Sequence, residues 1–170
     1  SQRRYAAAIG TDGRLVVVDL LTGETVATAA VGLIEAITHD AESDDILVLS
    51  SDFSGQRDFR RYYFGEGVLR RRYSSRRTIP EDISTLVVTG RDVVAGSTNG
   101  TLFRWLPYAT QPLTIAQGIS VPVLDLALSQ NRLHLLYRDG VLSLSSDLFA
   151  LPPTAIEETT YLRERTTPTT

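Results

Sequence analysis

The feature that most constrains the fold of this chain is a glycine-containing turn that recurs between pairs of short apolar stretches. Its clearest instance lies in Arg91 to Trp105, RDVVAGSTNGTLFRW, where Asn99 and Gly100 separate two apolar stretches. Asn-Gly tolerates positive φ angles at both residues, as the type I′ turn of a two-residue hairpin requires. The sequence therefore predicts a β-hairpin with a type I′ turn at Asn99-Gly100.

The same arrangement occurs three more times. Asp12-Gly13 lies between YAAAIG and LVVVDL, Asp139-Gly140 lies between LHLLY and VLSLSS, and a weaker version, Ser54-Gly55, lies between ILVLSS and FRRYYF. The four turns begin at residues 12, 54, 99 and 139, so the steps are 42, 45 and 40 residues. Repeats of this length that contain several short strands are typical of β-propeller blades. We therefore expect the four turns to be equivalent, each joining the second and third strands of a blade.

The strand patterns divide residues 1–153 into four such blades and leave a polar tail at 154–170. The blades cover about residues 5–31, 34–75, 83–116 and 122–150. Three strands are expected in the first blade, which lacks an innermost one, four in each middle blade, and three in the last. Pro152 and Pro153 end the pattern because proline donates no backbone hydrogen bond. The tail stretch AIEETTYLRER could form a helix or add an outer strand to the last blade.

Two stretches resemble known propeller repeats. Residues 10–24, GTDGRLVVVDLLTGE, are similar to the repeat of quinoprotein-type and outer-membrane-assembly propellers, in which Gly-Thr-x-Asp-Gly leads to an Asp and a Thr-Gly turn. Gly96 to Leu102 with Trp105 resembles the inner hairpin of WD-repeat blades, although Leu106 stands where that family has Asp. The resemblance implies an all-β fold, a β-propeller with about four blades of antiparallel four-stranded sheet.

Four blades are few for a closed ring. WD-repeat rings mostly close with six to eight blades, and four-bladed rings of the hemopexin type are commonly tied by a disulfide, which a chain without cysteine cannot form. We therefore expect an incomplete ring or part of a larger propeller, completed by other protein subunits. On its open sides we expect another polypeptide to bury five apolar residues, namely Val16, Val18, Leu124, Leu126 and Leu128.

The strongest compositional anomaly is the stretch from Arg57 to Arg77. It carries eight of the seventeen arginines and two acids, so its charge is +6 while the rest of the chain is −9. Arginines interleaved with aromatic residues are typical of nucleic-acid surfaces, but arginines on an edge strand also keep that edge from pairing with other chains. We favour an edge in solvent or facing an acidic protein. The candidate partner-binding residues are Arg57, Arg60, Arg61, Tyr62, Tyr63, Arg70, Arg71, Arg72, Tyr73, Arg76 and Arg77.

Other polar residues receive structural interpretations. The acidic loop from His39 to Asp45 lacks the glycine and terminal glutamate of an EF-hand loop, so we interpret it as a hairpin loop. His134 is expected to pack within its apolar strand. Asp19 and Asp125, which lie inside apolar stretches, either cap strands through backbone N–H groups or face a central channel, and we favour capping.

The sequence favours a non-enzymatic scaffold, a WD-repeat-like propeller segment that binds other proteins within an assembly. No catalytic motif is present, and we expect no catalytic residues, cofactor or metal. Two alternatives remain: a quinoprotein-like or hydrolase propeller that binds a ligand in its central channel, and a nucleic-acid-binding propeller that uses residues 57–77. No apolar run is long enough to span a bilayer, so no membrane insertion is expected. An intracellular location is favoured but not fixed.

Overall fold

A computed structural model describes residues 4–40, 42–75, 77–89, 92–106, 109–117, 121–129, 132–145 and 154–155. The regular secondary structure in these ranges consists of β-strands, with no helix among them. The chain forms two compact units, Ser1–Arg77 and Thr78–Thr170, called here the first unit and the second unit. The all-β character expected from the sequence is confirmed.

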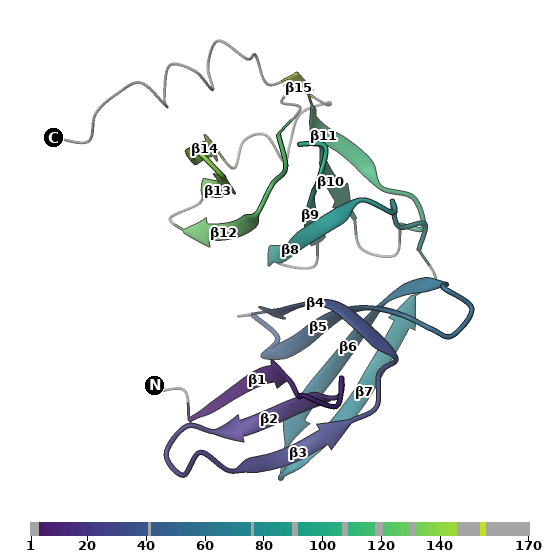
Figure 1. Ribbon diagram of the computed structural model, residues 1–170, viewed down its shortest axis with the longest axis vertical. Coiled ribbons are helices and arrows are strands. Elements are labelled where there is room, and N and C mark those ends of the chain that lie inside the picture. Colours follow the sequence, from purple (N-terminus) through teal and green to yellow (C-terminus); the bar gives the residue numbers. More distant parts are fainter. Residues whose placement is uncertain are drawn as a thin grey trace, which may run out of the picture. The chain divides into compact units, whose positions relative to one another are not determined.

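The first unit contains two antiparallel sheets, each with its strands in sequence order (Figure 1). The strands of the first sheet are β1 (Tyr5–Ile9), β2 (Leu15–Asp19) and β3 (Thr25–Ala29). Those of the second sheet are β4 (Leu33–Asp40), β5 (Asp45–Ser51), β6 (Arg57–Gly65) and β7 (Val68–Ser75). Short connections between sequential strands explain the antiparallel pairing, since such hairpins need only a few loop residues.

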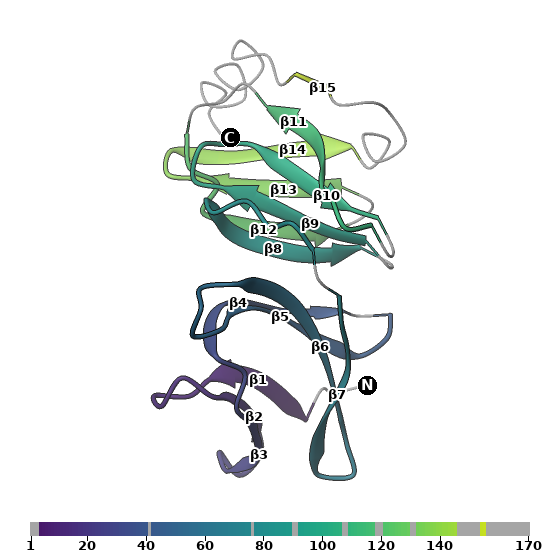
Figure 2. The ribbon, with the colours of Figure 1, turned by 90° about the vertical axis from the view of Figure 1, so that its right-hand side faces the viewer.

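The second unit also contains two sheets (Figure 2). The strands of the third sheet are β8 (Ile83–Thr89), β9 (Asp92–Ser97), β10 (Leu102–Trp105) and β11 (Leu113–Gln117), and those of the fourth are β12 (Asp125–Ser129), β13 (Arg132–Tyr137) and β14 (Gly140–Ser145). A short strand, β15 (Thr154–Ala155), pairs in parallel with β11. The beginning of the expected tail thus extends the third sheet rather than the last one.

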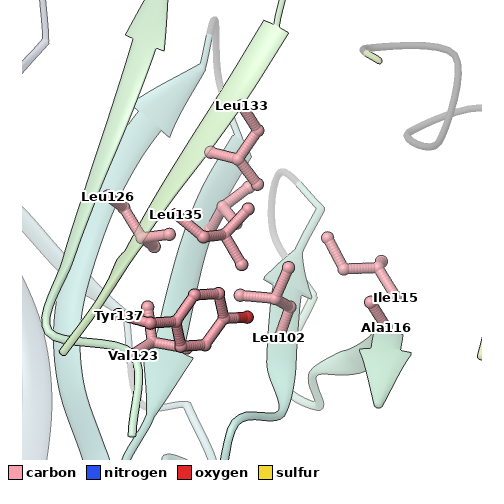
Figure 3. Close-up of a cluster of buried hydrophobic side chains, with 9 residues drawn as sticks. Leu102, Ile115, Ala116, Val123, Leu126, Leu133, Leu135 and Tyr137 are labelled. Atoms are coloured by element: carbon pink, nitrogen blue, oxygen red, sulfur yellow. The ribbon is translucent and has the colours of Figure 1, made fainter. Parts of the chain in front are cut away.

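Each unit is held together by side chains packed between its two sheets. In the first unit, Leu15 and Val17 of β2 pack with Ile46, Val48 and Tyr62 of the second sheet. In the second unit, β13 directs its buried side chains toward Leu102, as Figure 3 shows, and the cluster comprises Val94, Leu102, Ile115, Ala116, Val123, Leu126, Leu133, Leu135 and Tyr137. Burial of leucine and valine side chains contributes on the order of 1.5–3 kcal/mol each.

Three of the four predicted turns share one hydrogen-bond pattern. The first turn residue donates its N–H to the carbonyl four residues later: Gly10 to Arg14 at 2.8 Å, Asp52 to Gln56 at 3.0 Å and Ser97 to Thr101 at 3.0 Å. The glycine three residues on donates back to that first residue and has a φ angle of 75°, 79° or 83°. These turns join β1 to β2, β5 to β6 and β9 to β10. The three places are equivalent when the three strands of the first sheet are matched to the last three of the sequential four in the second and third sheets, so that the innermost strand is the one the first sheet lacks.

The predicted type I′ geometry at Asn99-Gly100 is wrong. Only Gly100 of that pair has a positive φ angle, because the loop is a three-residue one that ends in a left-handed glycine. The fourth turn differs again, since Tyr137 pairs directly with Gly140 across the two-residue loop of Arg138 and Asp139. It nevertheless joins β13 to β14, the second and third strands of its sheet, as predicted.

Candidate interaction surfaces

The arginines of β6 form ion pairs and a hydrogen bond within the first unit. Arg57 forms an ion pair with Glu35, and Arg60 donates to the backbone carbonyl of Val31. The guanidinium Nη1 of Arg61 lies 2.6 Å from Oδ2 of Asp40, and both side chains are buried. These three arginines belong to an interior strand of the sheet and bind groups within the first unit, and their role in partner binding stays a prediction.

The two tyrosines of β6 have different environments. Tyr62 is buried in the core of the first unit, and its place among the binding candidates stays a prediction. Tyr63 is partly exposed, and the guanidinium carbon of Arg72 lies 4.9 Å from the centre of its ring. A guanidinium at this distance from a ring face gains a cation–π attraction of about 0.5–1 kcal/mol at an exposed site.

The exposed arginines lie on β7, the edge strand of the second sheet, as the sequence predicted. Arg70 approaches Glu66 at 3.4 Å, and Nε of Arg72 lies 3.0 Å from Oδ1 of Asp45. Arg71 is exposed as well. Arg77 lies over the ring of Phe59, with 5.8 Å between its guanidinium carbon and the ring centre. Arg76 lies outside the described residues, as does the side chain of Tyr73.

The acidic loop from His39 to Asp45 connects β4 and β5 as a hairpin loop. Its end carboxylates, Asp40 and Asp45, are buried and face Arg61, at 2.6 and 3.9 Å from its Nη1. Burial opposes ionisation of Asp40, but hydrogen bonds from Arg61, Ser43 and the Glu42 amide outweigh it and hold the pKa of Asp40 below its ordinary value. In the part of the chain that is described, His, Asp and Glu side chains form no group of three that could hold a metal ion.

The carboxylates of Asp19 and Asp125 cap backbone groups, as favoured from the sequence. Asp19 accepts hydrogen bonds from the Arg4 side chain and from the Leu21 N–H, and both lower its pKa. Asp125 accepts from its neighbour, the Leu126 N–H, at 2.8 Å and from the Thr85 hydroxyl at 3.1 Å. Both residues therefore stabilise strand ends.

The outer face of the first sheet carries only small uncharged side chains. Strand residues alternate between faces, and Leu15, Val17 and Ala27 point into the core of the first unit. The opposite side consists of Ala6, Ala8, Val16, Val18, Thr25 and Thr28, called here the N-terminal face. The four alanines and valines are half-buried and the threonines are exposed. A sheet face that meets water normally carries longer polar side chains.

The fourth sheet also has an uncovered apolar region. Leu126 and Leu128 point into the core of the second unit, so the prediction that another polypeptide buries them is wrong. On the opposite side Leu136 pairs with Val141 and Asp125, and Leu136 and Val141 are 42% and 56% exposed. Among the residues whose side chains the structure describes, that side, called here the C-terminal face, consists of Asp125, Ala127, Ser129, Arg132, His134, Leu136 and Val141.

The sequence pattern could have located this second face. Leu133, Leu135 and Tyr137 of β13 are buried and share one side of the strand, so alternation places Leu136 on the other side. Leu124, the third leucine of the prediction, is 52% exposed just before β12 begins. The first sheet therefore has one packed face and one uncovered face of small uncharged side chains, whereas the uncovered face of the fourth sheet has the exposed Leu136 and Val141 among polar residues.

Comparison with models of protein families and with curated protein sequences gave no match. The crystal structures that are similar in fold include two of computationally designed proteins. The computationally designed Ika4 protein aligns with a TM-score of 0.54 and 20% identity over 85% of this chain and 87% of its own. The computationally designed Ika8 protein aligns with a TM-score of 0.50 and 18% identity over 85% of this chain, which spans 44% of that longer protein. At such identities the likeness supports the arrangement of the sheets alone.

Proposed function

We propose that this chain is a β-propeller segment that acts as a non-enzymatic interaction subunit, with its terminal sheets covered by another polypeptide. The observation that carries the proposal is the small, uncharged character of the N-terminal face, together with the exposed Leu136 and Val141 on the C-terminal face. Covering the second side of a three-stranded sheet that has alanine and valine on both sides removes further apolar surface from water and so stabilises the sheet. The four sheets, their sequential strand order and the repeated turns support a propeller architecture.

The arginine stretch supports a protein partner more than a nucleic acid. Three of its arginines are bound to Glu35, Asp40 and the Val31 carbonyl within the first unit. Two of the three arginines on β7 already face carboxylates, those of Glu66 and Asp45. Few of these charges are therefore free to neutralise phosphates, which is the main source of affinity for nucleic acid.

The test is whether the two faces expose apolar surface in the purified chain, or cause it to associate. Light scattering gives the oligomeric state, and the fluorescence of an apolar dye such as ANS reports uncovered apolar surface. We expect either association or dye binding, and both should decrease when Val18 or Leu136 is replaced by Glu. A monomer with no dye binding, unaffected by either change, would refute the proposal.

A further inference from the structure

Asn99 is an exposed asparagine followed directly by glycine, in the hairpin loop between β9 and β10. We propose that Asn99 is a modification site at which the side-chain amide deamidates through a cyclic imide formed with the backbone nitrogen of Gly100. The folded turn restricts this reaction to locally open states, and it accommodates only one of the two products. The inference is independent of the proposed function.

The sequence places the two reacting groups next to each other. Hydroxide removes the proton of the Gly100 N–H, and the nitrogen forms a bond with Cγ of Asn99. The bond from Cγ to Nδ2 breaks, and ammonia leaves with a proton from water, which regenerates the hydroxide. Both groups belong to one chain, so they need no encounter in solution. Glycine leaves the approach open because it has no side chain.

Water then opens the imide in one of two ways. Cleavage between Cγ and the Gly100 nitrogen restores the main chain and leaves aspartate at position 99. Cleavage between the main-chain carbonyl carbon of residue 99 and the Gly100 nitrogen leaves isoaspartate, in which the main chain runs through Cβ and Cγ. In both cases an amide and water give a carboxylate and ammonium, so no oxidant, reductant or cofactor takes part.

The folded hairpin holds both reacting groups in hydrogen bonds. The Gly100 N–H donates to the Ser97 carbonyl at 3.1 Å, and Gly100 is buried, which keeps hydroxide from its proton. Oδ1 of Asn99 accepts hydrogen bonds from the Ser97 hydroxyl at 2.6 Å and from the Thr101 N–H at 3.0 Å, so the side chain is held in place. The imide therefore forms only after the turn opens locally, which costs part of the stability of the hairpin.

The turn between β1 and β2 indicates that aspartate fits at position 99. Asp12 precedes a glycine with a φ angle of 75°, and Asn99 precedes Gly100, whose φ angle is 83°. Oδ1 of Asp12 accepts from the Arg14 N–H at 3.1 Å, as Oδ1 of Asn99 accepts from the Thr101 N–H at 3.0 Å. An aspartate at position 99 therefore keeps these hydrogen bonds and makes the acceptor charged, which strengthens them.

Isoaspartate does not fit the same turn. Its main chain contains an additional carbon atom, and its side-chain acceptor is the former main-chain carboxylate. The loop is closed by hydrogen bonds from the Ser97 N–H to the Thr101 carbonyl and from the Gly100 N–H to the Ser97 carbonyl. A longer loop loses at least one of them. Because β9 and β10 supply Val94 and Leu102 to the core of the second unit, isoaspartate lowers the stability of that unit.

The first experiment follows deamidation in the purified full chain, kept in mildly alkaline buffer either folded or in guanidinium chloride. Trypsin yields peptides 92–104 and 105–132, which separate Asn99 from Asn131, the other asparagine of the chain. Tandem mass spectrometry detects the replacement of NH2 by OH, and chromatography separates aspartate from isoaspartate. In guanidinium chloride we expect faster conversion at Asn99 than at Asn131, which precedes arginine. Folding should slow the conversion of Asn99 about tenfold or more, because a folded turn is open for a minor fraction of the time.

Two results of this experiment would overturn the inference. Equal rates at Asn99 and Asn131 in guanidinium chloride would overturn the assignment of the site. Equal rates at Asn99 in the folded and the unfolded chain would overturn the protection by the turn, and this comparison needs no variant.

Ser97→Ala tests how the turn protects Asn99. The change removes the hydroxyl that lies on Oδ1, and it should accelerate conversion in the folded chain by about two- to tenfold, the contribution of one hydrogen bond. The same variant in guanidinium chloride is the control and should react at the rate of the unchanged chain, while circular dichroism verifies that the variant folds. Slower conversion of the folded variant would show that the hydroxyl assists the reaction by stabilising charge on Oδ1, and would overturn its protective role.

The last experiment distinguishes the two products by their stability. Asn99→Asp carries the first product alone, and its midpoint of unfolding should be no lower than that of the unchanged chain, whereas Asn99→Ala lacks the acceptor and should unfold at lower denaturant. The incubated chain has the same charge as Asn99→Asp but also contains isoaspartate, so a part of it should unfold at lower denaturant than that variant. An incubated sample that contains isoaspartate and unfolds as Asn99→Asp does would overturn the exclusion of this product. An Asn99→Asp midpoint as low as that of Asn99→Ala would overturn the acceptance of aspartate.

Discussion

Arg61 of β6 and Asp40 at the end of β4 form a buried ion pair across the intervening strand β5, with 2.6 Å between Nη1 and Oδ2. Asp45, at the start of β5, is 3.9 Å from the same nitrogen. A single guanidinium thus faces two carboxylates at one end of the second sheet. The acidic loop and the arginine stretch are separate features of the sequence. Here the carboxylates of the loop and the guanidinium of Arg61 neutralise each other's charge.

Replacement of Arg61 by Met should destabilise the chain. The change leaves the buried carboxylate of Asp40 without its cation, while Asp45 keeps Arg72, and the loss of one partner from a buried ion pair costs about 3–5 kcal/mol. Urea unfolding followed by circular dichroism measures the free energy of unfolding. The control is Arg71→Met on the exposed edge strand β7, for which a change within about 0.5 kcal/mol is expected. Equal effects of the two variants would contradict the structural role of Arg61.

Stability should fall in acid. The pKa values of Asp19, Asp40 and Asp52 are below their ordinary value in the folded chain; in Asp52 the cause is foremost the hydrogen bond from the Ser54 hydroxyl. Such groups stabilise the fold above the unfolded pKa of about 3.9, and this contribution is lost as the pH falls through the folded values. We expect a lower urea midpoint at pH 3 than at pH 6. An unchanged midpoint would argue against these interactions.

Replacement of Gly100 by Val should destabilise the β9–β10 hairpin by on the order of 1 kcal/mol or more, because a β-branched residue is strained at positive φ. The φ angle there is 83°. Thr98→Val in the same turn is a suitable control, since Thr98 is exposed and its backbone N–H bond to the Asp82 carbonyl is kept. Thermal unfolding compares the two variants, and a Gly100→Val protein as stable as the control would refute the turn geometry.

Binding to nucleic acid should be weak. Most arginines of the 57–77 stretch that the structure describes face carboxylates or the Val31 carbonyl, so few counterions can be released from a bound oligonucleotide. Fluorescence anisotropy with a labelled random duplex, at about 50 and 200 mM salt, measures affinity and its salt slope. Micromolar binding with a steep salt dependence, lost in Arg70→Gln or Arg71→Gln, would overturn this expectation.

The sequence predicts the strands better than the surfaces. Turn residues act locally, so Gly13, Gly55 and Gly100 mark three hairpins correctly, and the number of strands in each sheet is right apart from β15. The turn type at Asn99 was wrong because Asn-Gly suits both a two-residue loop and the end of a three-residue loop. The local sequence does not distinguish the two.

The environments of the candidate binding residues could not be predicted from the sequence, for a different reason. Residues 57–77 were treated as one charged surface, whereas β6 is an interior strand and β7 an edge strand. A register shift between Arg61 and Tyr62 also leaves two consecutive side chains buried, which simple alternation cannot indicate. The partners of Arg61, 21 and 16 residues away in the sequence, follow from strand pairing rather than from neighbouring residues.

Trp105 is fully buried at the end of β10, and its indole nitrogen donates to the Thr78 carbonyl at 3.2 Å, so it fastens the first residue of the second unit to the third sheet. It is also the single tryptophan of the chain. Intrinsic fluorescence excited at the indole band therefore follows the second unit alone, while far-ultraviolet circular dichroism follows both. Any interval between the two melting curves would measure how independently the two halves of the polypeptide fold.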